Sequence, residues 1–254
     1  MNHYIGFKTI VTKEMTRFLR IWTQTLLPPA ITTVLYFIIF GQIIGSQIRS
    51  IHGFSYIQYI APGLIMMAVI TNSYGNVVSS FYSTRFQRSI EEMLVSPMPN
   101  ALILLGFVAG GVARGIIVGS TVTVLALFFT ELRVTHIFST IAIVILTSAL
   151  FSLAGFLNGI FARSFDDVAI VPTFILTPLT YLGGVFYAIS SLPPLWQTIS
   201  LANPILYMVD TFRYGILGIA ETNIALSFGL ISLLVITLFW INLHLLNKGV
   251  GIRT

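Results

Sequence analysis

The sequence predicts an all-α integral membrane protein with six transmembrane helices, an N-terminal amphipathic helix and a re-entrant helical hairpin between the fifth and sixth crossings. Two properties of the composition support this fold class: only 8% of the 254 residues are charged, and 56% are hydrophobic. An ordinary soluble domain carries about 25% charged residues, which keep its surface in contact with water. In addition, long apolar runs recur along the whole chain, which has a mean hydropathy of +0.93.

The same composition excludes a soluble enzyme, a disordered chain and an ordinary nucleic-acid-binding protein. The net charge of +5 comes from basic residues beside the apolar runs, which is where membrane topology requires them. The chain has no cysteine, so disulfides, cysteine metal sites and thiol chemistry are excluded as well.

The first twenty residues predict an amphipathic helix. Lys13, Arg17 and Arg20 fall opposite an apolar stripe, so this helix would lie in the headgroup plane with its basic face toward water and anionic lipid. The alternative is a cytoplasmic extension of the first crossing. No signal peptide is expected, because the first apolar run is too long and lacks a cleavage pattern. The stripe consists of Phe7, Val11, Met15, Phe18 and Trp22.

Six apolar stretches approach the length of about 20 residues that a helix needs to cross the hydrocarbon core. The fifth lies in an uncharged run that is too long for one crossing and awkward for two, and residues 190–194 (SSLPP) break it. Ser164 and Asp167 match the pattern that caps a helix start before this crossing. The predicted crossings are residues 21–45, 57–80, 101–129, 137–162, 168–187 and 224–246.

The charges in the loops predict that both termini are cytoplasmic. With the N-terminus inside, nine basic residues fall on the cytoplasmic side and three on the outer side, as the positive-inside rule requires. The cytoplasmic residues are Lys8, Lys13, Arg17, Arg20, Arg85, Arg88, Arg163, Lys248 and Arg253, and the outer residues are Arg49, Arg133 and Arg213.

The third crossing combines glycines at four-residue spacing with a charge inside the membrane. Glycine lets a neighbouring helix approach closely, so these positions predict helix packing. Arg114 lies on the same stripe, and a cation at this depth costs about 3 kcal/mol or more unless it faces protein or water. It is either a transport-pathway residue or a structural charge bonded to carbonyls or a polar neighbour. We favour the second, because no acidic partner is evident. The glycines are Gly106, Gly110, Gly111, Gly115 and Gly119, and a further pair, Gly155 and Gly159, lies in the fourth crossing.

Residues 181–218 are apolar enough for the membrane but too interrupted to cross it. A re-entrant hairpin of two short helices on the outer side satisfies both constraints if protein buries its turns. A loosely folded outer loop is the alternative. Asp210 and Arg213 are three residues apart and are expected to neutralise each other on one helical face. The helix breakers are Gly183 with Gly184, Pro193 with Pro194, and Asn203 with Pro204.

The cytoplasmic connection at residues 84–100 predicts a short amphipathic helix. Arg88 can pair with Glu91 and Glu92 on its charged side. Such a helix suits docking to a soluble partner, and a solvated connector is the alternative. The apolar edge is Ile90, Met93 and Leu94, and the residues that end the helix are Pro97 and Pro99.

Motifs for catalysis and nucleotide binding are absent from the sequence. It contains neither a G-x-x-x-x-G-K-[ST] phosphate loop nor an H-E-x-x-H metal motif. Acidic residues are essentially absent from the crossings, which weakens both an ion-coupled pump and an intramembrane hydrolase. We therefore expect no enzyme, no cofactor and no metal in this chain, and expect its driving energy to enter through another chain.

Two separated motifs and the six-crossing pattern resemble the ABC-2 type permeases, the membrane subunits of bacterial ATP-driven exporters. RSIEEMLVSPMP at residues 88–99 is similar to the cytoplasmic loop of that family. The run from LTPLTYLGG at residue 176 to YGILG at residue 218 is similar to its C-terminal signature. The resemblance covers nearly the whole chain, 1–254, as a single transmembrane domain.

The resemblance implies that two copies of this permease work with two copies of a P-loop ATPase, which binds ATP and Mg²⁺, in the bacterial inner membrane. Residues 1–20 would be a connecting helix, 84–100 the coupling loop, and 188–218 the outer re-entrant segment. Arg114 matches no role in the family. The residues that the resemblance assigns are Arg88, Glu91, Glu92, Leu94, Ser96 and Pro97 for ATPase coupling, Lys13, Arg17, Arg20 and Trp22 for the membrane surface, and Gly183, Gly184, Pro193, Pro194, Asn203 and Pro204 for the re-entrant segment.

Two other classes of function stay open at this stage. One is a self-sufficient channel or secondary transporter, for which kinked crossings and Arg114 would supply a path. The other is a membrane assembly scaffold. The sequence does not identify a substrate, because aromatic residues that would contact sugars, lipid tails or planar drugs are also those of interfacial belts. These residues are Tyr56, Tyr59, Tyr181, Phe186 and Tyr187.

Overall fold

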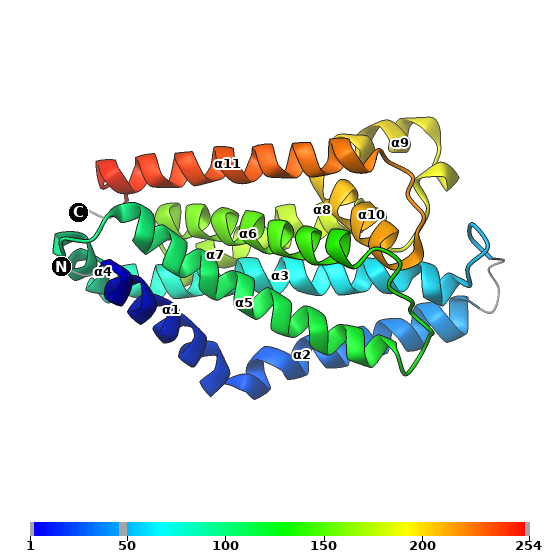
Figure 1. The fold of residues 1–254 in the computed structure, drawn as a ribbon, viewed down its shortest axis with the longest axis horizontal. Helices are drawn as coiled ribbons and strands as arrows, with labels where there is room; N and C mark the ends of the chain where they lie inside the picture. Colours follow the sequence, from blue (N-terminus) through cyan, green and yellow to red (C-terminus); the bar gives the residue numbers. More distant parts are fainter. Residues whose placement is uncertain (1–2, 46–49, 252–254) are drawn as a thin grey trace.

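The computed structural model describes residues 3–45 and 50–251, and within these ranges every regular element is a helix. Figure 1 shows α3, α5, α6 and α11 running along the long axis of the bundle. The start of α1, α4 and the end of α11 lie at one end, and α9 and α10 lie toward the other. The long helices are α3 (Tyr56–Phe86), α5 (Asn100–Ala126), α6 (Ile137–Phe161) and α11 (Ile224–Lys248).

Five helices in the described ranges are long and apolar enough to cross a membrane. They confirm the all-helical class and coincide with the predicted first to fourth and sixth crossings. The first comprises α2 (Trp22–Tyr36) and the beginning of a π-helical segment (Phe37–Ile44). The other four are α3, α5, α6 and α11.

The predicted fifth crossing is helical but interrupted. It passes through α7 (Phe165–Val171), a π-helical segment (Pro172–Leu176) and α8 (Thr177–Tyr181), and it ends before residue 187. Pro172 lacks a backbone N–H and cannot donate to the regular hydrogen-bond ladder, although its carbonyl accepts from the Thr177 N–H. At about 1.5 Å per residue the segment is about 25 Å long, against a hydrocarbon core of about 30 Å. The segment is therefore compatible with the predicted fifth crossing, which would bring the total number of crossings to six.

The predicted helix start before this segment is confirmed. The Ser164 side chain accepts a hydrogen bond from the Asp167 N–H, and the Asp167 carboxylate accepts one from the Ser164 N–H, which together form a capping box.

The N-terminal helix α1 (His3–Arg20) is separate from α2. The chain breaks at Ile21, and α1 lies obliquely against α5 (Figure 1). The buried residues of α1 are Ile10, Glu14 and Phe18, and only Phe18 among them belongs to the predicted apolar stripe. Trp22 belongs to α2 and is 60% exposed. Of the remaining predicted stripe residues, Phe7, Val11 and Met15 are half-buried.

The glycines of α5 explain which face of α1 is buried. A Cβ at Gly106 would meet Ile10, and one at Gly110 would meet Glu14, so both positions admit α1. On other sides of α5, Gly111 lies against Val77 and Ser152, and the remaining two glycines also face neighbouring helices. The predicted role of these glycines in helix packing is therefore confirmed, and α1, α3 and α6 are the partners.

The two short helices predicted within residues 181–218 are present as α9 (Pro194–Leu201) and α10 (Pro204–Leu217). Asn203 organises the turn between them: its side-chain oxygen accepts from the Ile205 N–H at 3.0 Å, and its Nδ2 donates to the Leu179 carbonyl at 2.6 Å. Pro194 and Pro204 each occupy the first helical turn, where a missing N–H costs little. Asn203 is therefore buried in this turn, whereas Leu201 and Ala202 before it are exposed, an arrangement that is compatible with the predicted re-entrant hairpin.

Candidate functional site

The short helix α4 (Ser89–Val95) forms one end of the bundle. Ile90 is buried, and Met93 and Leu94 are partly buried against an apolar cluster from α3, α5 and α6. The predicted apolar edge is thus confirmed, and it faces the protein. Glu91 and Glu92 consequently point outward and are exposed.

The predicted pairing of Arg88 with Glu91 and Glu92 is not found among the described residues. Arg88 has a left-handed backbone (φ 58°) and precedes the helix, so its side chain is not on the helical face that carries the two carboxylates. Two apolar residues flank these carboxylates at the surface: Phe86 is 66% exposed and Val95 is 86% exposed. Pro97 is exposed too, whereas the Ser96 hydroxyl donates to the Met93 carbonyl at 2.6 Å.

A cluster of polar side chains joins α1 to α3. Arg17 donates to the side-chain oxygen of Asn76 at 2.8 Å and lies 3.3 Å from Glu14. The Glu14 carboxylate is buried and accepts a hydrogen bond from Ser80 at 2.6 Å. Arg17 therefore faces the bundle, which differs from its predicted place on a basic face directed toward water and anionic lipid. Lys13 and Arg20 are exposed.

Arg114 lies at a pocket of about 330 Å³ between α2, α3 and α5. Its Nη2 donates to the Asn72 side-chain oxygen at 3.3 Å, so the predicted polar neighbour is present. The hydrogen bond to Asn72 supports the interpretation of Arg114 as a structural charge. Its position at the pocket supports the interpretation as a transport-pathway residue. The other residues of the pocket are Gln24, Pro28, Pro29, Thr32, Thr33, Tyr36, Leu64, Met67, Ala68 and Thr71.

Aromatic side chains continue from this pocket toward α8 and the turn that follows it. Tyr36, at the pocket, donates or accepts a hydrogen bond with the Tyr181 hydroxyl at 3.2 Å, and both rings contact Phe186. Phe186 also contacts Phe40 and lines a second pocket of about 580 Å³. Three of the aromatic residues singled out from the sequence, Tyr56, Phe186 and Tyr187, line that second pocket.

A buried ion pair anchors helix α10. The Arg213 Nη1 atom lies 3.6 Å from Asp210 Oδ1, and both side chains are at most 2% exposed, so the predicted neutralisation is confirmed. Arg213 also donates to the Gly184 carbonyl at 2.7 Å and lies over the Tyr59 ring at 4.0 Å. Arg213 is therefore a buried helix residue and not a loop charge, so it does not count among the basic residues used for the positive-inside rule.

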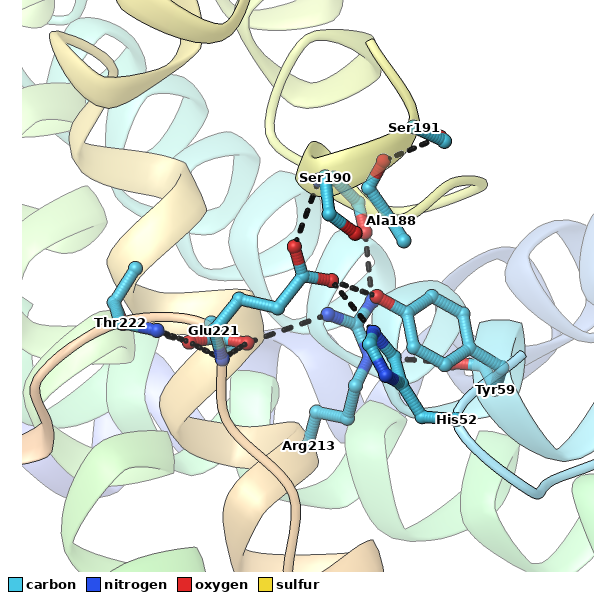
Figure 2. A network of polar contacts seen from close by, with 10 residues as sticks. His52, Tyr59, Ala188, Ser190, Ser191, Arg213, Glu221 and Thr222 are labelled. Atoms are coloured by element: carbon cyan, nitrogen blue, oxygen red, sulfur yellow. Dashed lines mark hydrogen bonds and ion pairs between the residues drawn. The ribbon is translucent and has the colours of Figure 1, made fainter.

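Glu221 extends this ion pair into a network that links four segments of the chain (Figure 2). Its carboxylate accepts hydrogen bonds from the Tyr59 hydroxyl at 2.7 Å and the Ser190 N–H at 3.0 Å, and it lies 3.7 Å from His52. Its backbone N–H donates to Asp210. The network holds the residue 50–55 loop, the start of α3, the segment after α8 and the α10–α11 connection together. No cluster of metal-ligating side chains occurs in the described ranges.

Sequence reasoning missed Glu14, Glu221 and the two asparagines that hold arginines. For Glu14 a signal existed, because it lies four residues from both Ile10 and Phe18 and so shares their face. Asn72 and Asn76 are one helical turn apart on α3, so one face of that helix presents both amides. For Glu221 no local signal existed, since its partners Tyr59 and Ser190 are distant in sequence.

The described residues include five helices that are long and apolar enough to cross a membrane, which is typical of a multi-pass membrane protein. The family follows from sequence comparison: a profile of the ABC-2 type transporter family matches residues 5–217. The chain belongs to the ABC-2 type transporter family, a family of membrane permeases, as the two sequence motifs indicated.

Two relatives illustrate the range of similarity. The chain is 54% identical over 253 residues to the inner membrane transport permease YadH of Escherichia coli K12, covering 99% of this chain and 98% of the relative. It is 22% identical over 216 residues to nodulation protein J of Rhizobium leguminosarum bv. viciae, covering 85% of this chain and 83% of that protein.

Proposed function

We propose that this chain is the permease subunit of an ATP-driven exporter in a bacterial inner membrane. Two copies of the chain would form the substrate path, and two copies of a separate P-loop ATPase would bind ATP and Mg²⁺ and supply the energy. The family match over residues 5–217 carries this proposal. The name of the 54% identical relative, an inner membrane transport permease, supports the location.

The surface of α4 supports an ATPase contact at this end of the bundle. Glu91 and Glu92 are exposed with apolar neighbours on either side, whereas the opposite side of α4 packs on α3, α5 and α6. A force applied to α4 would therefore reach these long helices through packed side chains. In this proposal, closure of the ATPase dimer moves α4, and the bundle opens outward by a rigid-body shift.

The pocket beside Arg114 and the aromatic residues after it support a path along α2. In the membrane-length segment that includes α2, only 17% of the residues are buried, which leaves surface for a second copy of the chain. The α9–α10 hairpin would close the outer side as the re-entrant segment. This arrangement gives 168–187 the role of the fifth crossing and completes six crossings with both termini in the cytoplasm.

The coupling assignment predicts that Glu91→Ala with Glu92→Ala weakens ATPase binding. Loss of two charged contacts at an interface should lower copurification of the cognate ATPase about tenfold and reduce ATP-dependent export in parallel. The matched control is Glu131→Ala, because Glu131 is 85% exposed near the opposite end. Thermal stability should stay unchanged in both proteins, since the altered side chains are exposed. Wild-type copurification in the double variant would show that α4 is not the docking site.

The proposed topology predicts which residues an impermeant thiol reagent reaches. The chain has no cysteine, so Glu91→Cys and Glu131→Cys each introduce a single reactive group. In intact spheroplasts the maleimide should label position 131 and leave position 91 unlabelled until the membrane is opened. Labelling of position 91 from outside would reverse the orientation and remove the ATPase contact. A purified chain that moves solute uphill alone would likewise refute the need for an ATPase.

A further inference from the structure

Arg114 is the charged residue of the 330 Å³ pocket between α2, α3 and α5. A guanidinium carries five N–H donors. The hydrogen bond that Arg114 forms in the described residues runs from Nη2 to the Asn72 side-chain oxygen, at 3.3 Å. Its Nε is buried without a hydrogen-bond partner, and no carboxylate within the described ranges forms an ion pair with it. The pocket therefore contains a cation with unused donors.

The neighbouring arginine shows what Arg114 lacks. Asn76 lies one turn after Asn72 on α3 and holds Arg17 in the same way, through its side-chain oxygen at 2.8 Å. Arg17, however, also lies 3.3 Å from the buried Glu14 carboxylate. The other Glu14 oxygen accepts from Ser80, so this carboxylate is already engaged on both oxygens. Of the two asparagine-held arginines, Arg17 has a carboxylate at ion-pair distance and Arg114 does not.

The remaining lining of the pocket is neutral and divides into two kinds. An apolar strip lies beside the polar groups, which come from Gln24, Thr32, Thr33, Tyr36, Thr71 and Asn72. A ligand that satisfies this lining has one anionic group for Arg114 and an apolar body for the strip. The strip consists of Pro28, Pro29, Leu64, Met67 and Ala68.

We propose that this pocket binds an anionic amphiphile, with its carboxylate or phosphate on Arg114 and Asn72 and its apolar chain along α2 and α3. Charge-assisted hydrogen bonds from a guanidinium to such a group are stronger than neutral ones, and the low dielectric of the site strengthens them further. If the chain is an exporter permease, on which this step rests, the ligand is its substrate or a membrane lipid that shares the same chemistry.

The test measures binding by the full-length permease alone, in nanodiscs of zwitterionic phosphatidylcholine, with dansyl-undecanoate as the fluorescent probe. Wild-type protein should bind the probe saturably and should not bind its uncharged methyl ester. Arg114→Gln should raise the Kd at least about tenfold, and Arg114→Lys should give an intermediate value because it keeps the charge but not the forked geometry. Arg133→Gln is the matched control, since Arg133 is 92% exposed.

A second variant separates loss of binding from loss of folding. Asn72→Asp places a carboxylate where the Asn72 oxygen now accepts from Arg114, so the internal ion pair should exclude the probe while the melting temperature holds or rises. Unchanged probe affinity in both Arg114→Gln and Asn72→Asp would overturn the proposal, as would equal binding of the methyl ester. Adding phosphatidylglycerol to the nanodiscs identifies the source: competition indicates a resident lipid headgroup, and its absence indicates a transported solute.

The assay contains no ATPase subunit, so its outcome is independent of the coupling test. If the probe does not bind but the ATPase copurifies, the anionic-ligand proposal is wrong and the permease proposal stands. If the probe binds but no ATPase associates, the anionic site stands and the exporter proposal is wrong.

Discussion

Replacing Arg213 with methionine is expected to lower the free energy of unfolding by about 3–5 kcal/mol, because it leaves Asp210 as a buried charge without its cation. Both side chains of this ion pair are at most 2% exposed. The loss extends beyond the pair, since Arg213 also donates to the carbonyls of Gly184 and Tyr59. The turn after α8 and the start of α3 would therefore lose their common partner, and the outer end of the bundle should loosen.

The measurement is the thermal midpoint and the monodisperse yield of detergent-purified protein. Asp210→Asn should also destabilise, but the Asp210→Asn, Arg213→Met double variant should lose less than the sum of the two single variants, because it leaves no buried charge unpaired. Arg133→Gln, at an exposed arginine, should stay within about 0.5 kcal/mol of wild type. A thermal midpoint for Arg213→Met equal to that control would show that the network does not hold the outer helices.

Composition and periodicity predicted the long helices because these signals are local. An apolar run of 20 or more residues specifies a membrane helix without reference to the rest of the chain. The Asp210–Arg213 pair followed from i,i+3 spacing in the same way. The short helix α4 was predictable too, since Pro97 and Pro99 follow its last residue and its apolar edge has helical spacing.

The features that sequence reasoning missed depend on contacts between distant residues. The spacing of Glu14 from Ile10 and Phe18 indicates its buried face, but not its partner Ser80 on α3, and nothing near Glu221 in the sequence indicates its bond to Tyr59. Arg114 was recognised as an intramembrane charge, but its asparagine neighbour lies on another helix. For Arg88 the i,i+3 and i,i+4 spacing was misleading, because Arg88 itself has a left-handed backbone and lies before the first residue of α4. Its side chain is therefore not on the helical face of Glu91 and Glu92.

The two candidate sites lie in different parts of the same bundle. Helix α4 lies at one end (Figure 1), whereas the Arg114 pocket lies between α2, α3 and α5. These two regions are connected through α3, which contacts α4, α5, α6 and α10. Helix α4 is therefore connected to the pocket through α3, and α3 is itself packed against α6.

Gly155→Ala is expected to disrupt this contact. An added Cβ at Gly155 of α6 would lie 2.5 Å from the backbone oxygen of Tyr74 in α3, and a backbone atom cannot move aside as a flexible side chain can. The two helices must separate, which in a packed interior costs about 1–3 kcal/mol. Separation would also break the hydrogen bond from Asn158 to the Tyr74 hydroxyl, now 2.7 Å long, which holds α3 against α6.

Gly75→Ala is the matched control for this prediction. Gly75 follows Tyr74 in α3, yet an added Cβ there meets nothing within 4 Å. Because alanine favours a helix interior over glycine by up to about 1 kcal/mol, this variant should keep or slightly raise the thermal midpoint. Gly155→Ala should lower that midpoint and reduce ATP-dependent export more than ATPase copurification, since α4 itself is intact. Equal midpoints for the two alanine variants would show that the close α3–α6 approach contributes nothing to stability.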